Sequence, residues 1–273
     1  MDDVLGYAGK RVVVTGAASG MGLATAALLV ELGAEVHTVD LRRPEVTSLA
    51  SFSETDLRDP RRIDATVSRI GGVVDALFNC AGLPNDFPAL DVVLVNFCGL
   101  RHLTEGVIPL MVDGGAIASV ASVAGMGWLA NLATVLELVR TPDFESARAW
   151  CEADPRRIAN AYGVSKEAIN AYTADRCVDL AARGLRINCL NPGPTDTPMM
   201  SHFETANGVE FMRGFPKPIG RMSTPEEQAW PLVFLNSGRA SYVTGTALFA
   251  DGGFTGALYT GRIDTSRLVP GSR

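Results

Sequence analysis

The sequence has few long apolar runs. No stretch approaches the ~20 uninterrupted apolar residues that a transmembrane helix needs. The acidic first residues lead into no apolar segment of the signal-peptide type. The formal net charge of −6 offers no basic excess to hold nucleic acid phosphates. These absences favour a cytoplasmic protein that acts on a small molecule, with neither a nucleic acid nor a membrane as its partner.

Cysteine and histidine are also scarce. The cysteines are scattered without CxxC spacing, and their odd number argues against a disulfide framework: Cys80, Cys98, Cys151, Cys177 and Cys189. The histidines His37, His102 and His202 form no cluster with metal-ligand spacing. We therefore expect reduced, mostly buried thiols and no metal site.

The length bounds the domain organisation. A chain of 273 residues is long enough for one large α/β domain and too short for two of ordinary size. We predict a single domain over residues 1–260, without internal repeats. Residues 261–273 form a tail whose last six residues, Leu-Val-Pro-Gly-Ser-Arg, resemble a scrambled protease-site linker from an expression vector.

Strand and helix patterns alternate along most of the chain. The β-branched run 11–15 ends at glycines and is typical of a buried strand, and a helix with apolar residues at i, i+3, i+4 and i+7 follows it. Further strands are predicted at 34–39, 74–79, 116–121, 186–190 and 247–250, and further helices at 60–70, 91–110, 162–182 and after Thr224. This order predicts a doubly wound parallel sheet with helices on both faces.

Two segments depart from the alternation. Between residues 126 and 160, the spacing of Leu132, Val135, Leu136 and Val139 is helical, so we expect an ordered helical insertion. Residues 198–220 are rich in large apolar side chains, and Gly214 and Gly220 would permit motion. We expect this second segment to act as a lid over a substrate pocket at the carboxyl ends of the strands.

A glycine-rich segment follows the first strand. Gly16, Gly20 and Gly22 stand between a strand and a helix, where backbone amides can approach a pyrophosphate. The helix N-terminus also favours negative charge there. The segment therefore predicts a dinucleotide site.

Asp40 stands at the end of the second predicted strand, eighteen residues after Gly22. A carboxylate at this place can accept hydrogen bonds from the adenosine ribose hydroxyls and would repel a 2′-phosphate. Arg42 and Arg43 follow closely and could instead attract that phosphate. We favour NAD over NADP as the cofactor.

Tyr162 and Lys166 lie four residues apart on a predicted helix, and therefore on one face of it. A phenol titrates near ~10, too high for a base at neutral pH, and a nearby cation favours the phenolate. We expect the charge of Lys166 to lower the pKa of Tyr162, so that Tyr162 exchanges a proton with an alcohol or ketone.

With these features, the chain resembles the short-chain dehydrogenase/reductase family in its classical form, from Lys10 to about Gly253. The motifs that carry the resemblance are Thr-Gly-x-x-x-Gly-x-Gly, Asn79-Cys80-Ala81-Gly82 and Tyr162-x-x-x-Lys166. The resemblance implies a Rossmann fold and cofactor-binding roles for Gly16, Ser19, Gly20, Met21, Gly22, Asp40, Leu41, Asp56, Leu57, Asn79, Ala81, Gly82, Tyr162, Lys166, Pro192, Gly193, Thr195 and Thr197. Thr195 would contribute through its backbone and Thr197 through its hydroxyl.

The same resemblance implies the catalytic residues Asn96, Ser122, Tyr162 and Lys166. Ser122 matches the family's catalytic serine, with Ser119 as the alternative. Asn96 matches an asparagine that holds a water between the catalytic lysine and solvent. Lys166 would also hold the nicotinamide ribose. In the oxidative direction, Tyr162 would remove the alcohol proton while a hydride passes to the nicotinamide.

One departure from the family pattern narrows the resemblance. Ser122 and Tyr162 are forty residues apart, where most classical members have about a dozen. A similar insertion occurs in the subgroup resembling 3α-hydroxysteroid dehydrogenase/carbonyl reductase and coniferyl-alcohol dehydrogenase. This implies a hydrophobic cyclic, steroid-like or aryl-allylic alcohol, or its carbonyl, as the substrate. We expect the substrate to contact Ser122, Trp128, Tyr162, Met199 and Phe203.

The family usually forms homodimers or homotetramers through its two long helices, and the insertion could alter that contact. Two other functions stay open at this point. One is a catalytically silent NAD(H)-sensing regulator, which the intact catalytic residues argue against. The other is an epimerase or dehydratase acting on a nucleotide-linked sugar, for which little chain is left after Gly253. An NADP-dependent carbonyl reductase is the alternative within the same chemistry.

Overall fold

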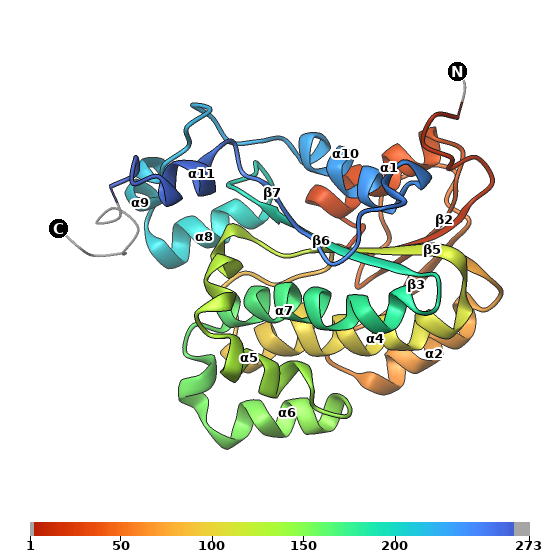
Figure 1. Ribbon diagram of the computed structural model, residues 1–273, viewed down its shortest axis with the longest axis horizontal. Helices are drawn as coiled ribbons and strands as arrows, with labels where there is room; N and C mark the ends of the chain where they lie inside the picture. The colour runs from red at the N-terminus through yellow and green to blue at the C-terminus, as the bar shows by residue number, and fades with distance from the viewer. Residues whose placement is uncertain (1–2, 265–273) are drawn as a thin grey trace.

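Seven strands form one parallel sheet in the order β3-β2-β1-β4-β5-β6-β7. The structure is a computed structural model that describes residues 3–264 (Figure 1). The strands are β1 Arg11–Thr15, β2 Glu35–Asp40, β3 Ser51–Glu54, β4 Val74–Asn79, β5 Met111–Val120, β6 Arg186–Pro192 and β7 Ala247–Ala250. The strand order reverses between β1 and β4, and this switch point opens the crevice in which such sheets bind ligands.

Helices cover both faces of the sheet (Figure 1). One face carries α1 Gly20–Glu31 and α10 Pro225–Asn236, which pack against each other. The other face carries α2 Pro60–Ile70, α3 Ala89–Val93, a π-helical segment Leu94–Gly99, α4 Leu100–Val107 and α7 Ala161–Ala181. The helices α8 Met199–Asn207, α9 Val209–Gly214 and α11 Phe254–Tyr259 gather at one end of the sheet. Short 3₁₀ turns cover Ile108–Leu110, Val123–Leu129, Pro155–Ile158 and Gly238–Ala240.

Local sequence signals explain where several helices begin. Asp59 accepts a hydrogen bond from the Arg61 amide at 3.0 Å, and Pro60 occupies the first turn of α2. The start of α10 is a capping box, in which Thr224 and Glu227 satisfy each other's backbone amides. Both helices therefore start where the sequence supplies a cap.

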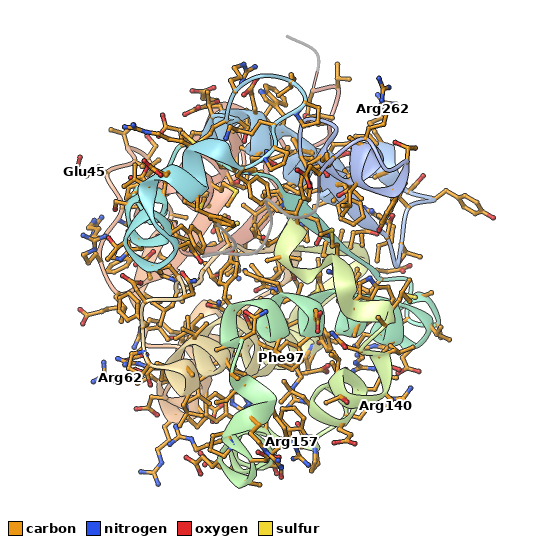
Figure 2. The ribbon with its side chains drawn as sticks, turned by 90° about the vertical axis from the view of Figure 1, so that its left-hand side faces the viewer. Glu45, Arg62, Phe97, Arg140, Arg157 and Arg262 are labelled. Carbon is orange, nitrogen blue, oxygen red and sulfur yellow. The ribbon has the colours of Figure 1, made fainter. Side chains whose placement is uncertain are left out.

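Two apolar cores lie on opposite faces of the sheet because side chains alternate along each strand. On β1, Val13 belongs to one core, while Val12 and Val14 belong to the other. The first core is completed by α2, α4, α7 and the insertion, and the second by α1 and α10. Figure 2 shows the side chain of Phe97 inside the molecule, with the labelled arginines at its periphery.

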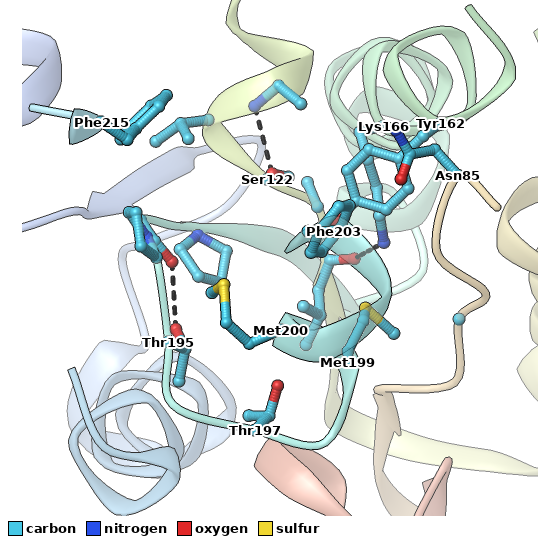
Figure 3. A pocket seen from close by; sticks show the side chains of 18 of the residues that line it. Asn85, Ser122, Tyr162, Lys166, Thr195, Thr197, Met199, Met200, Phe203 and Phe215 are labelled. Atoms are coloured by element: carbon cyan, nitrogen blue, oxygen red, sulfur yellow. Dashed lines mark hydrogen bonds between the residues drawn. The ribbon is translucent and has the colours of Figure 1, made fainter. Parts of the chain in front are cut away.

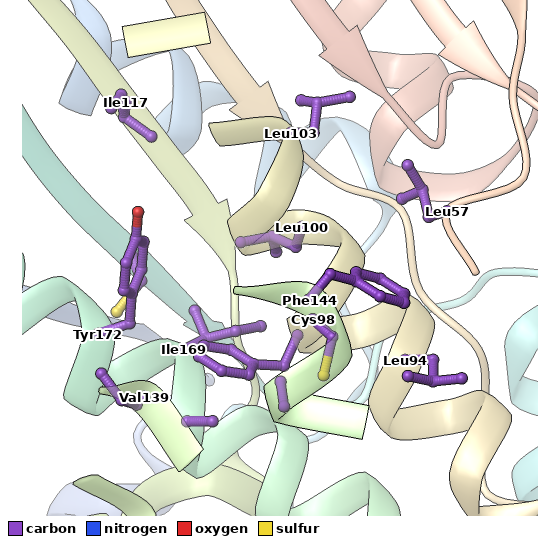
Figure 4. Packing of buried hydrophobic residues seen from close by; sticks show 14 of the residues in the cluster. Leu57, Leu94, Cys98, Leu100, Leu103, Ile117, Val139, Phe144, Ile169 and Tyr172 are labelled. Carbon is purple, nitrogen blue, oxygen red and sulfur yellow. The ribbon is translucent and has the colours of Figure 1, made fainter. Parts of the chain in front are cut away.

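The insertion folds into helices, as its apolar spacing predicts. It contains α5 Leu132–Val139 and α6 Phe144–Ala153, and α5 packs along α7. Figure 4 shows Val139 and Phe144 of this insertion among Cys98, Leu100 and Ile169 of the first core. The insertion is thus an ordered part of the domain, and it packs on the face of the sheet opposite α1.

The guanidinium of Arg101 joins the insertion to α4. It donates to the carbonyl oxygens of Val139 and Thr141 at 2.8 Å each, and of Asp143 at 2.9 Å, while Arg101 is only 6% exposed. These carbonyls end α5 or follow it, where a helix favours a cation.

The structure differs from the predicted elements at several places. The edge strand β3 and the helix α11 were not predicted, and the predicted helix 91–110 is interrupted by the π-helical segment. The predicted strand 34–39 is found one residue later, so that Asp40 belongs to β2. The tail beyond residue 264 lies outside the described residues.

Candidate active site

The glycine-rich segment packs tightly against the end of β4. Gly16 has a φ of 68°, and a Cβ on it would lie 2.5 Å from the Ala81 amide nitrogen. The hydroxyl of Thr15 accepts hydrogen bonds from the amides of Cys80 and Ala81 at 3.1 Å each. Glycine is therefore required at position 16 for two reasons, the positive φ and the close approach of a second backbone segment.

The N-terminus of α1 lacks a side-chain cap. Ser19 is the N-cap residue but makes no capping hydrogen bond, and the first turn has no acidic residue. By contrast, capping side chains satisfy the N-termini of α2, α6 and α10. The amides of this turn therefore suit an anionic ligand, as a pyrophosphate site requires.

A cleft of about 310 Å³ extends from this helix terminus. Of the predicted cofactor residues, it is lined by Gly16, Ser19, Gly20, Met21, Gly22, Asp40, Leu41, Asp56, Leu57, Ala81, Gly82 and Thr197. The structure thus brings most of the predicted cofactor residues to one surface.

Asp40 is the last residue of β2 and lines the cleft. Its carboxylate accepts hydrogen bonds from the Ala18 amide at 2.9 Å and the Arg42 amide at 3.1 Å. Arg42 also lines the cleft. Arg43 is exposed and does not line it. Close by, Arg58 binds the carboxylate of Asp56 with an N–O distance of 2.7 Å, and this hydrogen bond lowers the pKa of Asp56.

Asn79 was predicted to contact the cofactor, but the structure places it behind the cleft wall. It is 1% exposed, and its amide donates to Thr104 at 2.9 Å and to Ser119 at 3.2 Å. The hydroxyl of Ser119, the alternative catalytic serine, therefore accepts a hydrogen bond within the sheet. Asn79 ties the ends of β4 and β5 together.

A second cavity of about 400 Å³ lies beside the cleft. The predicted residues that line it are Met21, Gly82, Ser122, Tyr162, Lys166, Pro192, Gly193, Thr195, Thr197, Met199 and Phe203. Figure 3 shows Tyr162 and Lys166 facing it from α7 and Phe203 from α8. Most of the remaining wall is apolar. Met126 and Asn160 of the insertion, with Met200 and Asn207 of the segment 198–220, line the cavity in segments expected to wall it. Asn85 and Phe254 lie outside both segments, and tertiary folding alone brings them to the cavity.

Trp128 was predicted to contact the substrate, but it does not belong to the described lining of the cavity. Its side chain packs against the first core instead. The 3₁₀ turn Val123–Leu129 directs Met126, rather than Trp128, to the cavity.

Ser122 is positioned by a network of buried asparagines. Its amide donates to Asn191 Oδ1 at 3.3 Å, and Asn170 Nδ2 donates to the same oxygen at 3.1 Å. Asn170 Nδ2 also donates to the Gly125 carbonyl at 3.0 Å. These contacts fix the turn after β5, and neither asparagine was identified from the sequence.

Burial dominates the titration of Tyr162. It raises the pKa of the phenol to about 12, against a hydrogen bond with Ser122 that lowers it. The ring stacks edge-on against Phe203, with 5.0 Å between centroids. The expected lowering of this pKa by Lys166 is not found: burial is the larger influence, and the Lys166 Nζ, 5.6 Å from the ring centroid, donates to the Val120 carbonyl at 2.8 Å.

Lys166 is itself perturbed. Burial lowers the pKa of its ammonium to about 8, against the favourable influence of Cys80 and Cys189. A Cβ on Gly82 would lie 3.7 Å from the Lys166 Nζ and 3.3 Å from the Asn96 Oδ1. Glycine at position 82 thus keeps the space beside the lysine open.

Asn96 lies in the π-helical segment and is fully buried. Its Oδ1 accepts from the Leu83 amide at 2.6 Å, and its Nδ2 donates to the Leu83 carbonyl at 3.0 Å and to Ser165 at 3.2 Å. Its side chain therefore anchors the segment after β4, a contact that the sequence did not reveal. The water-holding role expected for Asn96 stays a prediction.

Helix α8 contacts both the loop after β4 and Tyr162. His202 Nδ1 lies 2.7 Å from the Asp86 carboxylate, and its ring lies 5.9 Å from that of Phe87, which lines the cleft. The next residue along α8, Phe203, contacts Tyr162 on the inner side. Consecutive residues of α8 thus contact the loop after β4 on one side and Tyr162 on the other.

The two cavities meet along one shared wall, formed by Met21, Cys80, Gly82, Thr197 and Met199. A ligand that fills the cleft reaches this wall from one side, and a ligand beside Ser122 and Tyr162 reaches it from the other. The arrangement can therefore hold two molecules in contact, one of them with an oxygen at the tyrosine.

Within residues 3–264, no group of three or more His, Cys, Asp or Glu side chains is placed to hold a metal ion. No helix in that range is long and apolar enough to span a membrane.

Comparisons with known proteins agree with this geometry. A short chain dehydrogenase family model matches residues 10–133, and an enoyl-(acyl carrier protein) reductase model matches residues 155–255. Coniferyl-alcohol dehydrogenase of Pseudomonas sp. (strain HR199 / DSM 7063) is 34% identical over 89% of this chain and 96% of its own. The 3-alpha-hydroxysteroid dehydrogenase/carbonyl reductase of Comamonas testosteroni is 32% identical over 90% of this chain and 97% of its own.

A solved structure extends the similarity to the fold. The 3-alpha-hydroxysteroid dehydrogenase from Pseudomonas sp. B-0831, complexed with NADH, superposes with a TM-score of 0.77 at 30% identity. The match covers 93% of this chain and all of that one. The sheet order, the glycine-rich segment, the tyrosine–lysine pair and these similarities together show that the chain belongs to the short-chain dehydrogenase/reductase family, whose members are NAD(P)-dependent oxidoreductases acting on CH–OH donors.

Proposed function

We propose that this protein interconverts a hydrophobic cyclic or aryl-allylic alcohol and its carbonyl, with NAD(H) as cofactor. The observation that carries the proposal is the wall shared by the two cavities, because it joins the cofactor cleft to the pocket that holds Tyr162 and Ser122. The relatives named for coniferyl alcohol and 3-alpha-hydroxysteroids support this substrate class.

The residues of the cleft fit a dinucleotide. The uncapped N-terminus of α1 would receive the pyrophosphate, and Asp40 would accept hydrogen bonds from the adenosine ribose. The carboxylate of Asp40 disfavours a 2′-phosphate, while Arg42 is the feature that would favour one. When bound, NAD(H) supplies the acceptor or donor of the hydride. We propose NAD(H) because Asp40 lies at the strand end and accepts two backbone amides that fix its position.

We propose that Tyr162 transfers the proton to or from the substrate oxygen and that Ser122 hydrogen-bonds the same oxygen. A phenol with a pKa of about 12 is protonated at neutral pH and can donate its proton to a carbonyl oxygen. Removing an alcohol proton requires a stronger influence of the Lys166 charge on the phenol. Lys166 would supply that charge and would hold the nicotinamide ribose.

The cavity lining supports a bulky apolar substrate. Side chains of methionine and phenylalanine from the proposed lid, residues 198–220, form much of its wall: Met199, Met200, Phe203, Phe211, Met212 and Phe215. Flexible methionine side chains adapt to differently shaped rings. From the proposed insertion, residues 126–160, Met126 and Asn160 reach the cavity. We place both segments in the single catalytic domain 1–260.

We also propose a homodimer or homotetramer. The family contact through the two long helices would use α4 and α7, but α5 packs along α7. The insertion therefore covers part of the helical face that such a contact would need. Sedimentation of the purified protein would show which assembly forms.

The test is turnover followed by nicotinamide absorbance, with NAD and NADP in turn, against hydroxysteroids, aryl-allylic alcohols, terpenoid alcohols and small secondary alcohols, together with the corresponding carbonyls. We expect turnover with NAD on one hydrophobic class. Tyr162→Phe should bind NADH like the wild type and lose turnover by about two to four powers of ten, the usual contribution of a general acid/base.

Each other outcome has a defined meaning. Retained turnover in Tyr162→Phe would remove Tyr162 from the mechanism. Preference for NADP would support the carbonyl reductase alternative and assign the cofactor choice to Arg42. Tight NADH binding without turnover on any alcohol or carbonyl would favour the NAD(H)-sensing regulator.

A further inference from the structure

Gln228 lies in the first turns of α10 and lines neither cavity, yet it is 2% exposed. Its Nε2 donates one hydrogen bond to the Ser223 hydroxyl at 2.8 Å and another to the Ala250 carbonyl at 2.9 Å. One amide therefore joins α10, the end of β7 and the segment that precedes α10.

Ser223 in turn pairs with the loop that follows β6. Its amide donates to the Pro194 carbonyl at 3.1 Å, and its carbonyl accepts from the Asp196 amide at 2.9 Å. Together these form a parallel bridge between Ser223 and Thr195. Their hydroxyl oxygens are 2.9 Å apart. The loop 193–197 is thus held by both backbone and side-chain hydrogen bonds from Ser223.

The direction of these hydrogen bonds follows from the donors present. Both Nε2 protons of Gln228 are used, so the Ser223 hydroxyl accepts one of them. Thr195 donates its own proton to the Gly193 carbonyl at 3.0 Å, and Ser223 donates to Thr195 at 2.9 Å because its other acceptor, the Pro194 carbonyl, is farther away at 3.4 Å. The chain therefore runs from Gln228 through Ser223 and Thr195 to Gly193.

The reverse orientation of the Gln228 amide is excluded by chemistry. Its oxygen would face the Ala250 carbonyl, and two acceptors cannot bond to each other. In the observed orientation, Oε1 is buried and has no hydrogen-bond partner among the described residues. An unsatisfied buried acceptor costs free energy, so stability alone does not explain a glutamine at this position.

With the adenosine ribose at Asp40 and the pyrophosphate at the start of α1, the nicotinamide end of the cofactor would reach the shared wall, to which Thr197 of this loop belongs. We propose that Gln228 is a positioning residue for this nicotinamide end. Through Ser223, it sets the conformation of loop 193–197, whose residues Gly193, Thr195 and Thr197 line the substrate cavity (Figure 3). Because Ser223 binds the Pro194 carbonyl and the Asp196 amide, the loop is held in place at the edge of the cavity. This inference rests on the proposed NAD(H) site.

The proposal is tested by comparing two ligands that differ at the nicotinamide end. NADH carries the nicotinamide, whereas ADP-ribose lacks it and keeps the adenosine and pyrophosphate. Gln228→Met keeps the volume and removes both donors. We expect it to weaken NADH binding about five- to tenfold, the loss expected for a hydrogen bond, and to leave ADP-ribose binding within about twofold.

Two further variants separate positioning from folding. Ser223→Ala should repeat the selective loss of NADH affinity, and Ser223→Thr, which keeps the hydroxyl, should restore it. Thr224→Ala is the matched control. It removes the hydroxyl that caps α10 by accepting from the Glu227 amide at 3.3 Å, but it leaves the hydrogen bonds from Gln228 through Ser223 to Thr195 intact. It should lower the unfolding temperature without changing the ratio of NADH to ADP-ribose affinity.

Equal losses for both ligands, or unchanged NADH affinity in Gln228→Met and Ser223→Ala, would overturn the proposal. If Gln228→Met does not fold, the two Ser223 variants decide alone. Failure of the wild type to bind either ligand would instead overturn the proposed cofactor site, and this inference with it. If the wild type binds both ligands, the proposed cofactor site stands, and the variants then test the role of Gln228 alone.

Discussion

At the scale of single residues, burial sets the chemistry of the tyrosine–lysine pair more strongly than their spacing does. The spacing places both on one helix face, but the lysine ammonium is bonded to the Val120 carbonyl. The same burial that raises the pKa of Tyr162 to about 12 lowers that of Lys166 to about 8. A ligand in the cleft would alter both environments, because both residues line a cavity adjoining it.

The depressed pKa of Lys166 predicts a pH dependence of stability. The unfolded lysine titrates near ~10.4, so between about pH 8 and that value the unfolded chain binds more protons than the folded one. The contribution of Lys166 to the free energy of unfolding should therefore rise with pH across this window, by up to about 3 kcal/mol. Below pH 8 its contribution is constant.

Urea unfolding of the ligand-free protein between pH 7 and 10 measures this slope. Lys166→Met should lose it, while Lys10→Met, at a side chain 50% exposed, should keep it. An unchanged slope in Lys166→Met would mean that the buried lysine titrates normally.

A local sequence pattern was enough to identify several residues that the structure brings to the two cavities. The glycine-rich segment, Ser122, Tyr162 and Lys166 lie at the two cavities. Asn79 and Trp128 line neither cavity, because sequence order does not show which side of a strand end or turn faces a cavity. Gln228 and Asn170 had no signal, since their partners are distant in the chain.

At the scale of elements, the insertion is held by a cation at the end of a helix rather than by an ion pair. Arg101 donates to carbonyl groups that would otherwise be left without donors in a buried place. Arg101→Met should therefore lower the free energy of unfolding by about 2–3 kcal/mol. Urea unfolding measures the loss.

Arg140→Met is the matched control for this prediction. Arg140 also belongs to the insertion, but it forms an ion pair with Asp175 and its side chain is 62% exposed. Such pairs contribute about 0–1 kcal/mol, so the control should be nearly neutral. Similar losses in the two variants would show that the buried carbonyl contacts are not what holds the insertion.

The elements with strong apolar periodicity were predicted to within a few residues, such as α2 and β4. The strand β3 has the sequence Ser-Phe-Ser-Glu and no apolar run, so only its pairing with β2 reveals it. The π-helical turn at Asn96 has no composition of its own. It is stabilised by contacts with Leu83 and Ser165, which tertiary structure brings near.

At the scale of the whole molecule, the cleft predicts a linkage between cofactor binding and unfolding. NADH at a hundred times its Kd should raise the free energy of unfolding by about 2.7 kcal/mol, and the unfolding temperature by about 5–10 °C. NADPH at the same concentration should give a smaller shift because of Asp40. Asp40→Ser should narrow the difference, which thermal unfolding with each ligand measures. A larger shift with NADPH in the wild type would contradict the assignment of NAD.

The doubly wound sheet followed from the alternation of strands and helices, which is a property of the whole chain. The two cavities and their contact could not be predicted from that alternation, because they depend on how α8, the loop after β4 and the turn after β5 converge.

The shared wall has a consequence for how this protein can change by mutation. A substitution at Met21, Cys80, Gly82, Thr197 or Met199 alters both cavities at once, so a gain for a new alcohol at these positions would be coupled to a change in cofactor affinity. Residues that border the substrate cavity alone, such as Met126, Phe211 and Met212, are free of that coupling. Substrate range can therefore diverge through the lid and the turn after β5, while the wall between the cavities is kept unchanged.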